Sequence, residues 1–132
     1  MKLLLDTGVL LRWFEGRQGL SRSHRRALRN AKSDEPLLVS DISLWEIATL
    51  SELGRIRLRL PLRDWLEQAT APPLVTRCGI TPAIAAEVAT LPSTFHRDPA
   101  DRIIVATARV HGATLLTTDR PIIRAGIVPT LR

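Results

Sequence analysis

The chain has 132 residues, of which 45% are hydrophobic and 24% are charged. These values are typical of a globular protein and exclude a disordered or collagen-like chain, and the length suits a single domain spanning residues 1–132. Its apolar runs are too short to cross a membrane, and Asp6 interrupts the first run too early for a signal peptide. The lone cysteine, Cys78, cannot form an internal disulfide, so a cytoplasmic location is expected.

The charge balance is strongly basic, with a net charge of +6. Seventeen of the nineteen basic residues are arginine, whose planar guanidinium group suits phosphate. One interpretation is a polyanionic partner, either a nucleic acid or an acidic protein. The other is an ordinary solvated basic surface.

Short apolar runs alternate with amphipathic segments along the whole chain. Thr7 is expected to cap the first helix, and Ser43 with Glu46 fits a capping box at the start of another. Residues 55–59 alternate arginine with apolar residues, as a short extended edge would. The expected strands are residues 2–5, 37–39, 74–78, 113–117 and 127–128. The expected helices are residues 7–15, 21–32, 43–53, 62–69, 81–91 and 98–111, with one more turn opened by Asp119.

Strands that alternate with helices through short connections predict an α/β fold, with three layers (α/β/α) around a short central parallel sheet. The segment 98–111 is apolar on nearly all sides, which predicts a central, buried helix. Trp13, Trp45 and Trp65 lie in helical patterns and are expected in the core.

Four acidic residues fall at the ends of expected elements. Asp6 follows the first strand and Asp119 follows the fourth, while Glu46 and Asp101 lie in the first turns of helices. The carboxyl ends of parallel strands share one edge of a sheet, where ligand sites gather. Four acids there would repel one another without a cation, and oxygen ligands favour Mg²⁺ or Mn²⁺ over zinc. Taken singly, Glu46 and Asp119 are also explained by helix capping, whereas Asp6 directly after three leucines is poorly explained by capping alone.

Four segments, in this order, match one known family. They are residues 3–7, 40–47, 96–106 and 115–119, and the third, which reads His-Arg-Asp-Pro-Ala-Asp-Arg at its start, is the most specific. On these segments the chain resembles PIN-domain ribonucleases, and within them the VapC toxins of bacterial toxin–antitoxin modules. Family members often carry an aromatic residue where Ala100 stands, a difference that concerns packing more than chemistry.

The resemblance implies roles for individual residues. Asp6, Glu46, Asp101 and Asp119 would hold Mg²⁺ or Mn²⁺ and be the catalytic residues. The hydroxyl groups of Thr7 and Thr118 would orient those carboxylates. Asp98 would either cap the following helix or contribute to the site, and Arg102 would contact substrate or pair with an acid. Arg22, Arg25, Arg29, Arg55 and Arg57 are candidate contacts for RNA phosphates.

The activity that the resemblance implies is metal-dependent hydrolysis of RNA by water, in the toxin of a toxin–antitoxin pair. The implied partners are an RNA substrate such as tRNA or another structured RNA, a cognate antitoxin protein and a second copy of the chain in a homodimer. The alternative is a catalytically silent PIN-like module that binds RNA or protein. That alternative would normally lack the acids, and here all four positions are filled.

Three unrelated classes share single features with the chain. Asp6-Thr7-Gly8 matches the triplet of aspartic proteases, but these need an all-β chain. Phosphotransfer receivers also gather acids at a sheet edge, but they want adjacent acids and a late lysine. A Ser-His-Asp hydrolase would need a Gly-x-Ser-x-Gly elbow, which is missing. His96 is expected to form a hydrogen bond within its loop rather than act as a base.

Overall fold

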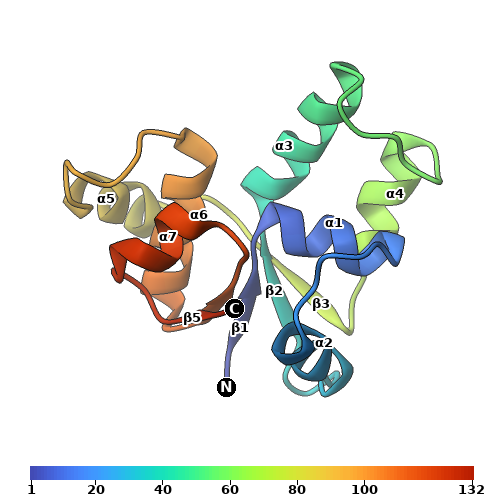
Figure 1. The fold of residues 1–132 in the computed structure, drawn as a ribbon, viewed down its shortest axis with the longest axis horizontal. Coiled ribbons are helices and arrows are strands. Elements are labelled where there is room, and N and C mark those ends of the chain that lie inside the picture. The colour runs from blue at the N-terminus through green and yellow to red at the C-terminus, as the bar shows by residue number, and fades with distance from the viewer.

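The computed structural model of the protein describes residues 1–132 and consists of a five-stranded sheet flanked by helices (Figure 1). Every pairing in the sheet is parallel, and the strand order is β3-β2-β1-β4-β5. In chain order the elements are β1 (Leu3–Leu5), α1 (Thr7–Glu15), α2 (Arg22–Arg29), β2 (Leu37–Ser40), α3 (Asp41–Glu52), α4 (Leu62–Ala69), β3 (Val75–Cys78), α5 (Pro82–Thr90), α6 (Pro99–His111), β4 (Thr114–Leu116), α7 (Arg120–Ala125) and β5 (Thr130–Leu131).

Two hydrophobic cores form because successive side chains of a strand point to opposite faces of the sheet. Leu5 packs into the core covered by α1, α2 and α4, and Leu4 packs into the core covered by α6 and α7. Figure 1 shows these two groups of helices on either side of the sheet. The predicted three-layer α/β fold is therefore confirmed.

The predicted buried helix is α6. Asp98 caps its first turn by accepting the backbone N–H of Asp101, and Pro99 occupies the first helical position, where no N–H is needed. Ile104 and Val105 are fully buried. The helix ends at Gly112, whose φ of 63° is a left-handed conformation that favours glycine.

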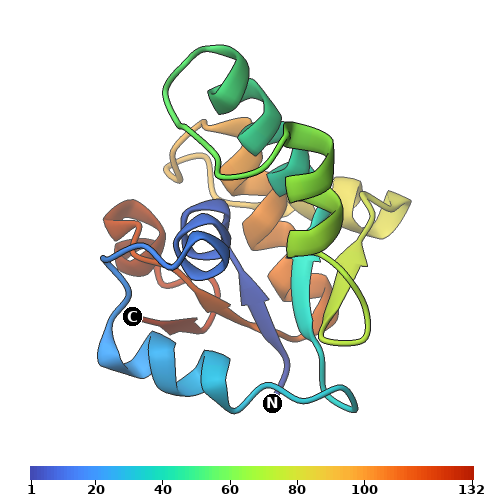
Figure 2. The same ribbon diagram turned by 90° about the vertical axis from the view of Figure 1, so that its right-hand side faces the viewer.

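The carboxyl edge of the sheet is where several helices begin. The chain enters α1 directly after β1, α3 directly after β2, and α7 soon after β4. Figure 2 shows β1 and β2 pointing upward, away from α2 at the bottom of the view, although His24 in the first turn of α2 reaches the Leu131 carbonyl oxygen at the end of β5. The first turns of α1, α3 and α7 therefore share one edge of the molecule.

Two predicted helix starts are wrong by a short distance. Asp6, not Thr7, is the N-cap of α1, because its side chain accepts the Val9 N–H. Ser40, not Ser43, is the N-cap of α3, because β2 runs into the helix with no intervening loop. The Ser43–Glu46 capping box therefore does not form, and Ser43 is buried inside the helix.

Three other expectations differ from the structure. The segment 55–59 is irregular, with a bend at each end, rather than a strand, although its arginines are exposed and its apolar residues half-buried as the alternation predicts. The last strand is at Thr130–Leu131 rather than 127–128, because Val128 is buried in the core instead of joining the sheet. Trp65 is fully buried and Trp13 half-buried, but Trp45 is 61% exposed.

None of the helices combines the length and the apolar character that crossing a membrane requires.

Candidate metal centre

Three of the four predicted acidic residues are tied to the starts of helices at the carboxyl edge of the sheet, whereas Glu46 lies beyond the first turn of α3, contrary to expectation. Asp6 is the N-cap of α1 and Asp119 is the N-cap of α7. Asp101 lies in the first turn of α6, three residues after the N-cap Asp98. Glu46 projects from α3, which contacts both α1 and α6.

Capping and a role in the site are not exclusive for these residues, because a carboxylate has two oxygens. Asp6 accepts the Val9 N–H with Oδ1 at 2.7 Å, and its Oδ2 faces Thr117. Asp119 accepts the Ile122 N–H with Oδ1 at 3.0 Å. The helix starts thus fix each carboxylate with one oxygen and leave the other for a ligand.

The hydroxyl group that links two of the acids belongs to Thr117. It donates to Asp6 Oδ2 at 2.5 Å and accepts the backbone N–H of Asp119 at 2.9 Å. Thr118, which was expected to orient the carboxylates, instead faces Arg12, whose Nη1 lies 3.5 Å from its hydroxyl oxygen. The role of Thr117 has no signal in the sequence, because neighbouring residues of an extended segment point to opposite sides and the pattern does not say which side faces the site.

The pKa of Asp101 is raised well above its ordinary value of 3.8. Burial raises this pKa to about 7, and repulsion by Asp98, Asp119, Glu46 and Asp6 acts in the same direction. Each of these residues is therefore close enough to Asp101 to disfavour its negative charge. A carboxyl group with this pKa is only partly ionised at neutral pH unless a cation compensates its charge.

The pKa values of two other acids at the same edge are also raised. Burial raises the pKa of Asp6, although the hydrogen bond from Thr117 opposes the effect. Burial also raises the pKa of Glu46, and the charges of Asp98 and Asp6 add to it, while a hydrogen bond from Thr7 opposes it. The edge therefore concentrates negative charge that its hydrogen bonds only partly stabilise.

No lysine or arginine forms an ion pair with Asp6, Glu46, Asp101 or Asp119. Arg12 is near enough to lower the pKa of Asp6, but this effect is smaller than those of burial and hydrogen bonding. The proximity of Arg12 to Asp6 has no signal in the sequence, because the helical pattern of α1 does not distinguish this arginine from its neighbours.

Arg102 neither pairs with an acid nor faces them. Its guanidinium group donates to the backbone carbonyl oxygens of Phe95, His96 and Val88 at 3.3, 3.4 and 3.4 Å. It also lies over the Phe95 ring, 5.9 Å from the centroid. Arg102 therefore holds the loop between α5 and α6 against the start of α6.

Thr7 lies beside the site on α1. Its hydroxyl oxygen is 2.9 Å from that of Ser43 on α3, and it also hydrogen-bonds the Glu46 carboxylate. The contact joins the first turns of α1 and α3, so it fixes Glu46 relative to Asp6.

The tightest group of candidate ligands is His96, Asp101 and Asp119, whose ligand atoms all lie within 4.8 Å of one another. His96 Nε2 is 3.4 Å from Asp101 Oδ2, yet this buried nitrogen forms no hydrogen bond, contrary to expectation. Carboxylate oxygens that repel one another, together with an unpaired buried nitrogen, fit a divalent cation. The chain thus supplies donor atoms that could hold a metal ion.

Two of the five candidate RNA-contacting arginines line the same groove. Arg25 and Arg29 line a groove of about 320 Å³ between α1 and α2, together with Arg12, Arg17 and Trp13. Arg22, Arg55 and Arg57 do not line it. Because Arg12 also neighbours Asp6, one end of this basic groove lies beside the acidic edge.

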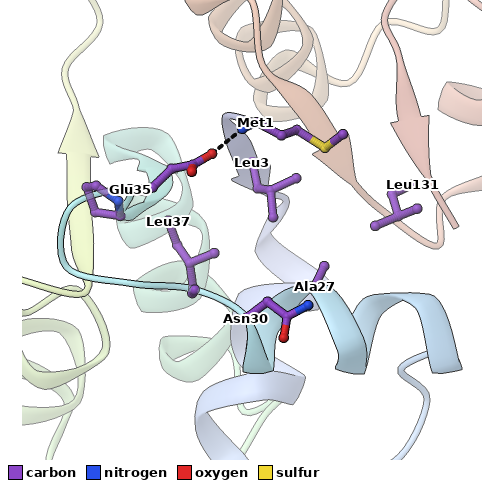
Figure 3. Close-up of a pocket in the computed structure, with 9 residues that line it drawn as sticks. Met1, Leu3, Ala27, Asn30, Glu35, Leu37 and Leu131 are labelled. Carbon is purple, nitrogen blue, oxygen red and sulfur yellow. Dashed lines mark hydrogen bonds and ion pairs between the residues drawn. The ribbon is translucent and has the colours of Figure 1, made fainter.

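A second pocket, shown in Figure 3, lies at the opposite edge of the sheet and is mostly apolar. Leu3, Leu37 and Leu131 line it from three strands, and the amino group of Met1 pairs with Glu35 across it. It contains none of the predicted site residues. The acidic edge is therefore the better candidate for chemistry.

Residues 3–128 match the sequence pattern of the PIN domain, and the chain belongs to the PIN domain family. Its relatives include Ribonuclease VapC22 of Mycobacterium tuberculosis, which is 43% identical over 118 residues that cover 89% of this chain and 87% of that protein. The resemblance seen in the sequence motifs is therefore confirmed.

Solved structures agree on the fold. VapBC2 from Rickettsia felis, bound to a DNA fragment from its promoter, superposes with a TM-score of 0.74 at 14% identity, over 99% of this chain and 98% of that one. VapBC-1 from nontypeable Haemophilus influenzae superposes with a TM-score of 0.73 at 15% identity, over 99% and 97%. At these identities the likeness establishes the fold and not the chemistry.

Proposed function

We propose that this protein is a divalent-metal-dependent endoribonuclease that acts as the toxin of a toxin–antitoxin pair. The observation that carries the proposal is the convergence of Asp6, Glu46, Asp101 and Asp119 at one sheet edge, where mutual repulsion and burial raise the pKa of Asp101 to about 7. The relationship to Ribonuclease VapC22 supports the same activity.

A cation bound at this edge, Mg²⁺ or Mn²⁺, would lower the pKa of water and shield the charge that grows on phosphate oxygens. Asp101 and Asp119 would hold it, and Asp6 and Glu46 would complete the negative site. Thr117 keeps the Asp6 carboxylate oriented through its hydroxyl, and Thr7 does the same for Glu46. Asp98 contributes charge and fixes the first turn of α6 through its cap.

The basic groove of Arg12, Arg17, Arg25 and Arg29 supports RNA as the substrate. A negatively charged site repels a polyanion, so cationic side chains must bring the phosphate backbone to it. Arg12 lies between the groove and Asp6, which suits it to contact a phosphate next to the bond that is cleaved. The groove can therefore direct single-stranded or looped RNA, including tRNA loops, toward the acids.

An antitoxin protein is the proposed regulatory partner, and the protein is proposed to be a cytoplasmic homodimer. A structural neighbour from Klebsiella pneumoniae is a toxin–antitoxin complex, which supports a protein partner. Trp45 on α3 and Leu53, the C-cap of that helix, are 61% and 59% exposed, so apolar surface is available for a protein to cover. Co-expression with the neighbouring reading frame, followed by purification through a tag on this chain, tests for the antitoxin.

The proposed activity is tested with Asp6→Asn. The asparagine side-chain oxygen can still cap α1, so the variant removes charge and preserves the helix start. Because metal-assisted chemistry supplies several kcal/mol of barrier reduction, cleavage of a labelled RNA in Mg²⁺ or Mn²⁺ should fall by about 100-fold or more. Asp34→Asn, in an exposed turn, is the matched control and should cleave like the wild type.

Undiminished cleavage by Asp6→Asn would contradict the proposal. If the wild type binds RNA but does not cleave any, with or without metal, the catalytically silent module is the better interpretation. The presence of all four acids argues against that alternative.

A further inference from the structure

His96 is a side chain that the proposed chemistry has not used, although it lies at the acidic edge. It belongs to the loop between α5 and α6 rather than to a helix or strand. Its backbone carbonyl oxygen accepts from Arg102, and its ring stands edge-on to the buried Phe95, with centroids 4.6 Å apart and an interplanar angle of 76°. The loop therefore holds the imidazole in one orientation.

That orientation directs Nε2 toward the carboxylates. Nε2 is buried, lies 3.4 Å from Asp101 Oδ2 and forms no hydrogen bond. A buried polar atom without a partner is costly, and such atoms are rare in folded proteins. If His96 served only to orient Asp101, its ring nitrogen would hydrogen-bond the carboxylate, and the geometry does not give that bond.

The spacing instead suits ligands of one ion. At metal–ligand distances of about 2.0–2.2 Å, two ligands of the same ion lie up to about 4.4 Å apart. His96, Asp101 and Asp119 have ligand atoms within 4.8 Å of one another, so small side-chain rotations would bring all three onto one cation. The three residues come from the α5–α6 loop, α6 and the start of α7, and all are held by backbone hydrogen bonds or caps.

We propose that His96 is a nitrogen ligand of the divalent cation, bound together with Asp101 and Asp119; this rests on the proposed function. Mg²⁺ prefers oxygen ligands, whereas imidazole binds first-row transition metals well. A site with one nitrogen and several carboxylate oxygens therefore selects Mn²⁺ over Mg²⁺. The histidine thus determines which metal the enzyme uses.

The test is pulsed electron paramagnetic resonance of Mn²⁺ bound to the full chain. A directly coordinated imidazole modulates the Mn²⁺ spin echo through its nitrogen nucleus. We expect this modulation in the wild type, and we expect its frequencies to change when the protein is labelled with ¹⁵N-histidine. This measurement needs no substitution, so it does not depend on whether a variant folds.

Two variants assign the nitrogen to one histidine. His96→Gln should lose the modulation and bind Mn²⁺ at least about 10-fold more weakly, with a smaller change for Mg²⁺. His111→Gln, at the opposite end of α6, is the matched control and should retain both the modulation and the affinity. Circular dichroism checks that both variants are folded.

The outcomes separate this inference from the proposed function. Tight Mn²⁺ binding by the wild type without nitrogen modulation would overturn the role of His96 and leave the acidic metal site standing. Modulation that persists in His96→Gln would overturn it equally. Failure of the wild type to bind either Mn²⁺ or Mg²⁺ would overturn both proposals.

Discussion

Glu15 and Asp101 are both acidic side chains largely removed from solvent, yet their surroundings move their pKa values in opposite directions. Burial alone would raise the pKa of Glu15, but hydrogen bonds from Trp65, Arg59 and Arg17 bring it below its ordinary value. Asp101 has no such donors to its carboxylate, and burial with neighbouring acids raises its pKa to about 7. The protein thus contains one compensated and one uncompensated buried acid.

The surroundings of Glu15 and the acidic edge around Asp101 have different roles in the molecule. Glu15 is the last residue of α1, and its carboxylate accepts the Trp65 indole N–H of α4 at 2.9 Å. It also accepts the Arg59 backbone N–H, in the loop that precedes α4, at 3.3 Å. Every donor is supplied by the chain, so the carboxylate stabilises the fold. At the acidic edge the chain supplies too few donors, so the charge of Asp101 is not compensated within the chain.

The largest expected effect is on stability when the compensated acid is removed. Glu15→Ala leaves the Trp65 indole and the Arg17 guanidinium without their shared partner. Loss of one partner of a buried charged pair costs about 3 kcal/mol, so the free energy of unfolding in urea should fall by about that amount. Glu52→Ala, which is exposed on α3, is the control and should change it by less than about 0.5 kcal/mol.

Removing the charge of the uncompensated acid, Asp101, should raise stability rather than lower it. Asp101→Asn removes a repelled charge, so without metal at pH 7.5 the variant should be more stable than the wild type by about 2 kcal/mol. Thermal unfolding in a chelator measures the difference. A variant less stable than the wild type under these conditions would mean that the Asp101 charge is already compensated within the chain.

The difference in stability between the metal-free wild type and Asp101→Asn should depend on pH. The folded-state pKa of Asp101, about 7, lies above its ordinary value of 3.8, so between these values the folded state binds more protons than the unfolded state. Metal-free wild type should therefore lose stability relative to Asp101→Asn as the pH rises from about 4 to 7, with little further change above. A constant difference between the two proteins across this range would contradict the raised pKa.

The smallest expected effect concerns the hydroxyl that orients Asp6. Thr117→Val removes the donor to Asp6 and the acceptor of the Asp119 N–H. Because groups that orient metal ligands typically affect affinity or activity 10–100-fold, RNA cleavage should fall by about 10-fold. Thr118→Val tests the position that the motif suggested, and it should cleave RNA within about 2-fold of the wild type.

Much of the local structure could be predicted from the sequence because caps and helix ends are decided by neighbours in the chain. The Asp98-Pro99 start and the Gly112 end of α6 are examples. The order of the strands could not be predicted, because it depends on contacts between segments far apart. The strand β1 pairs with β2 on one side and with β4 on the other.

The candidate site was predictable at the level of its acids and not at the level of its supporting residues. Asp6 and Asp119 follow strands, which is visible in the sequence. The choice between Thr117 and Thr118 depends on which way one residue points, and the exposure of Trp45 depends on which side of α3 finds a neighbour. The position of His96 depends on a loop that Arg102 holds, a contact with no sequence signal.

The central position of β1 has a consequence for protein synthesis. This strand is made first, yet one of its two neighbours in the sheet, β4, is among the last elements to leave the ribosome. A nascent polypeptide that ends before α6 carries Asp6 and Glu46 but neither Asp101 nor Asp119. RNA cleavage would therefore begin only after α6 and the start of α7 have been synthesised, and a product that ends before α6 would be harmless to the cell that makes it.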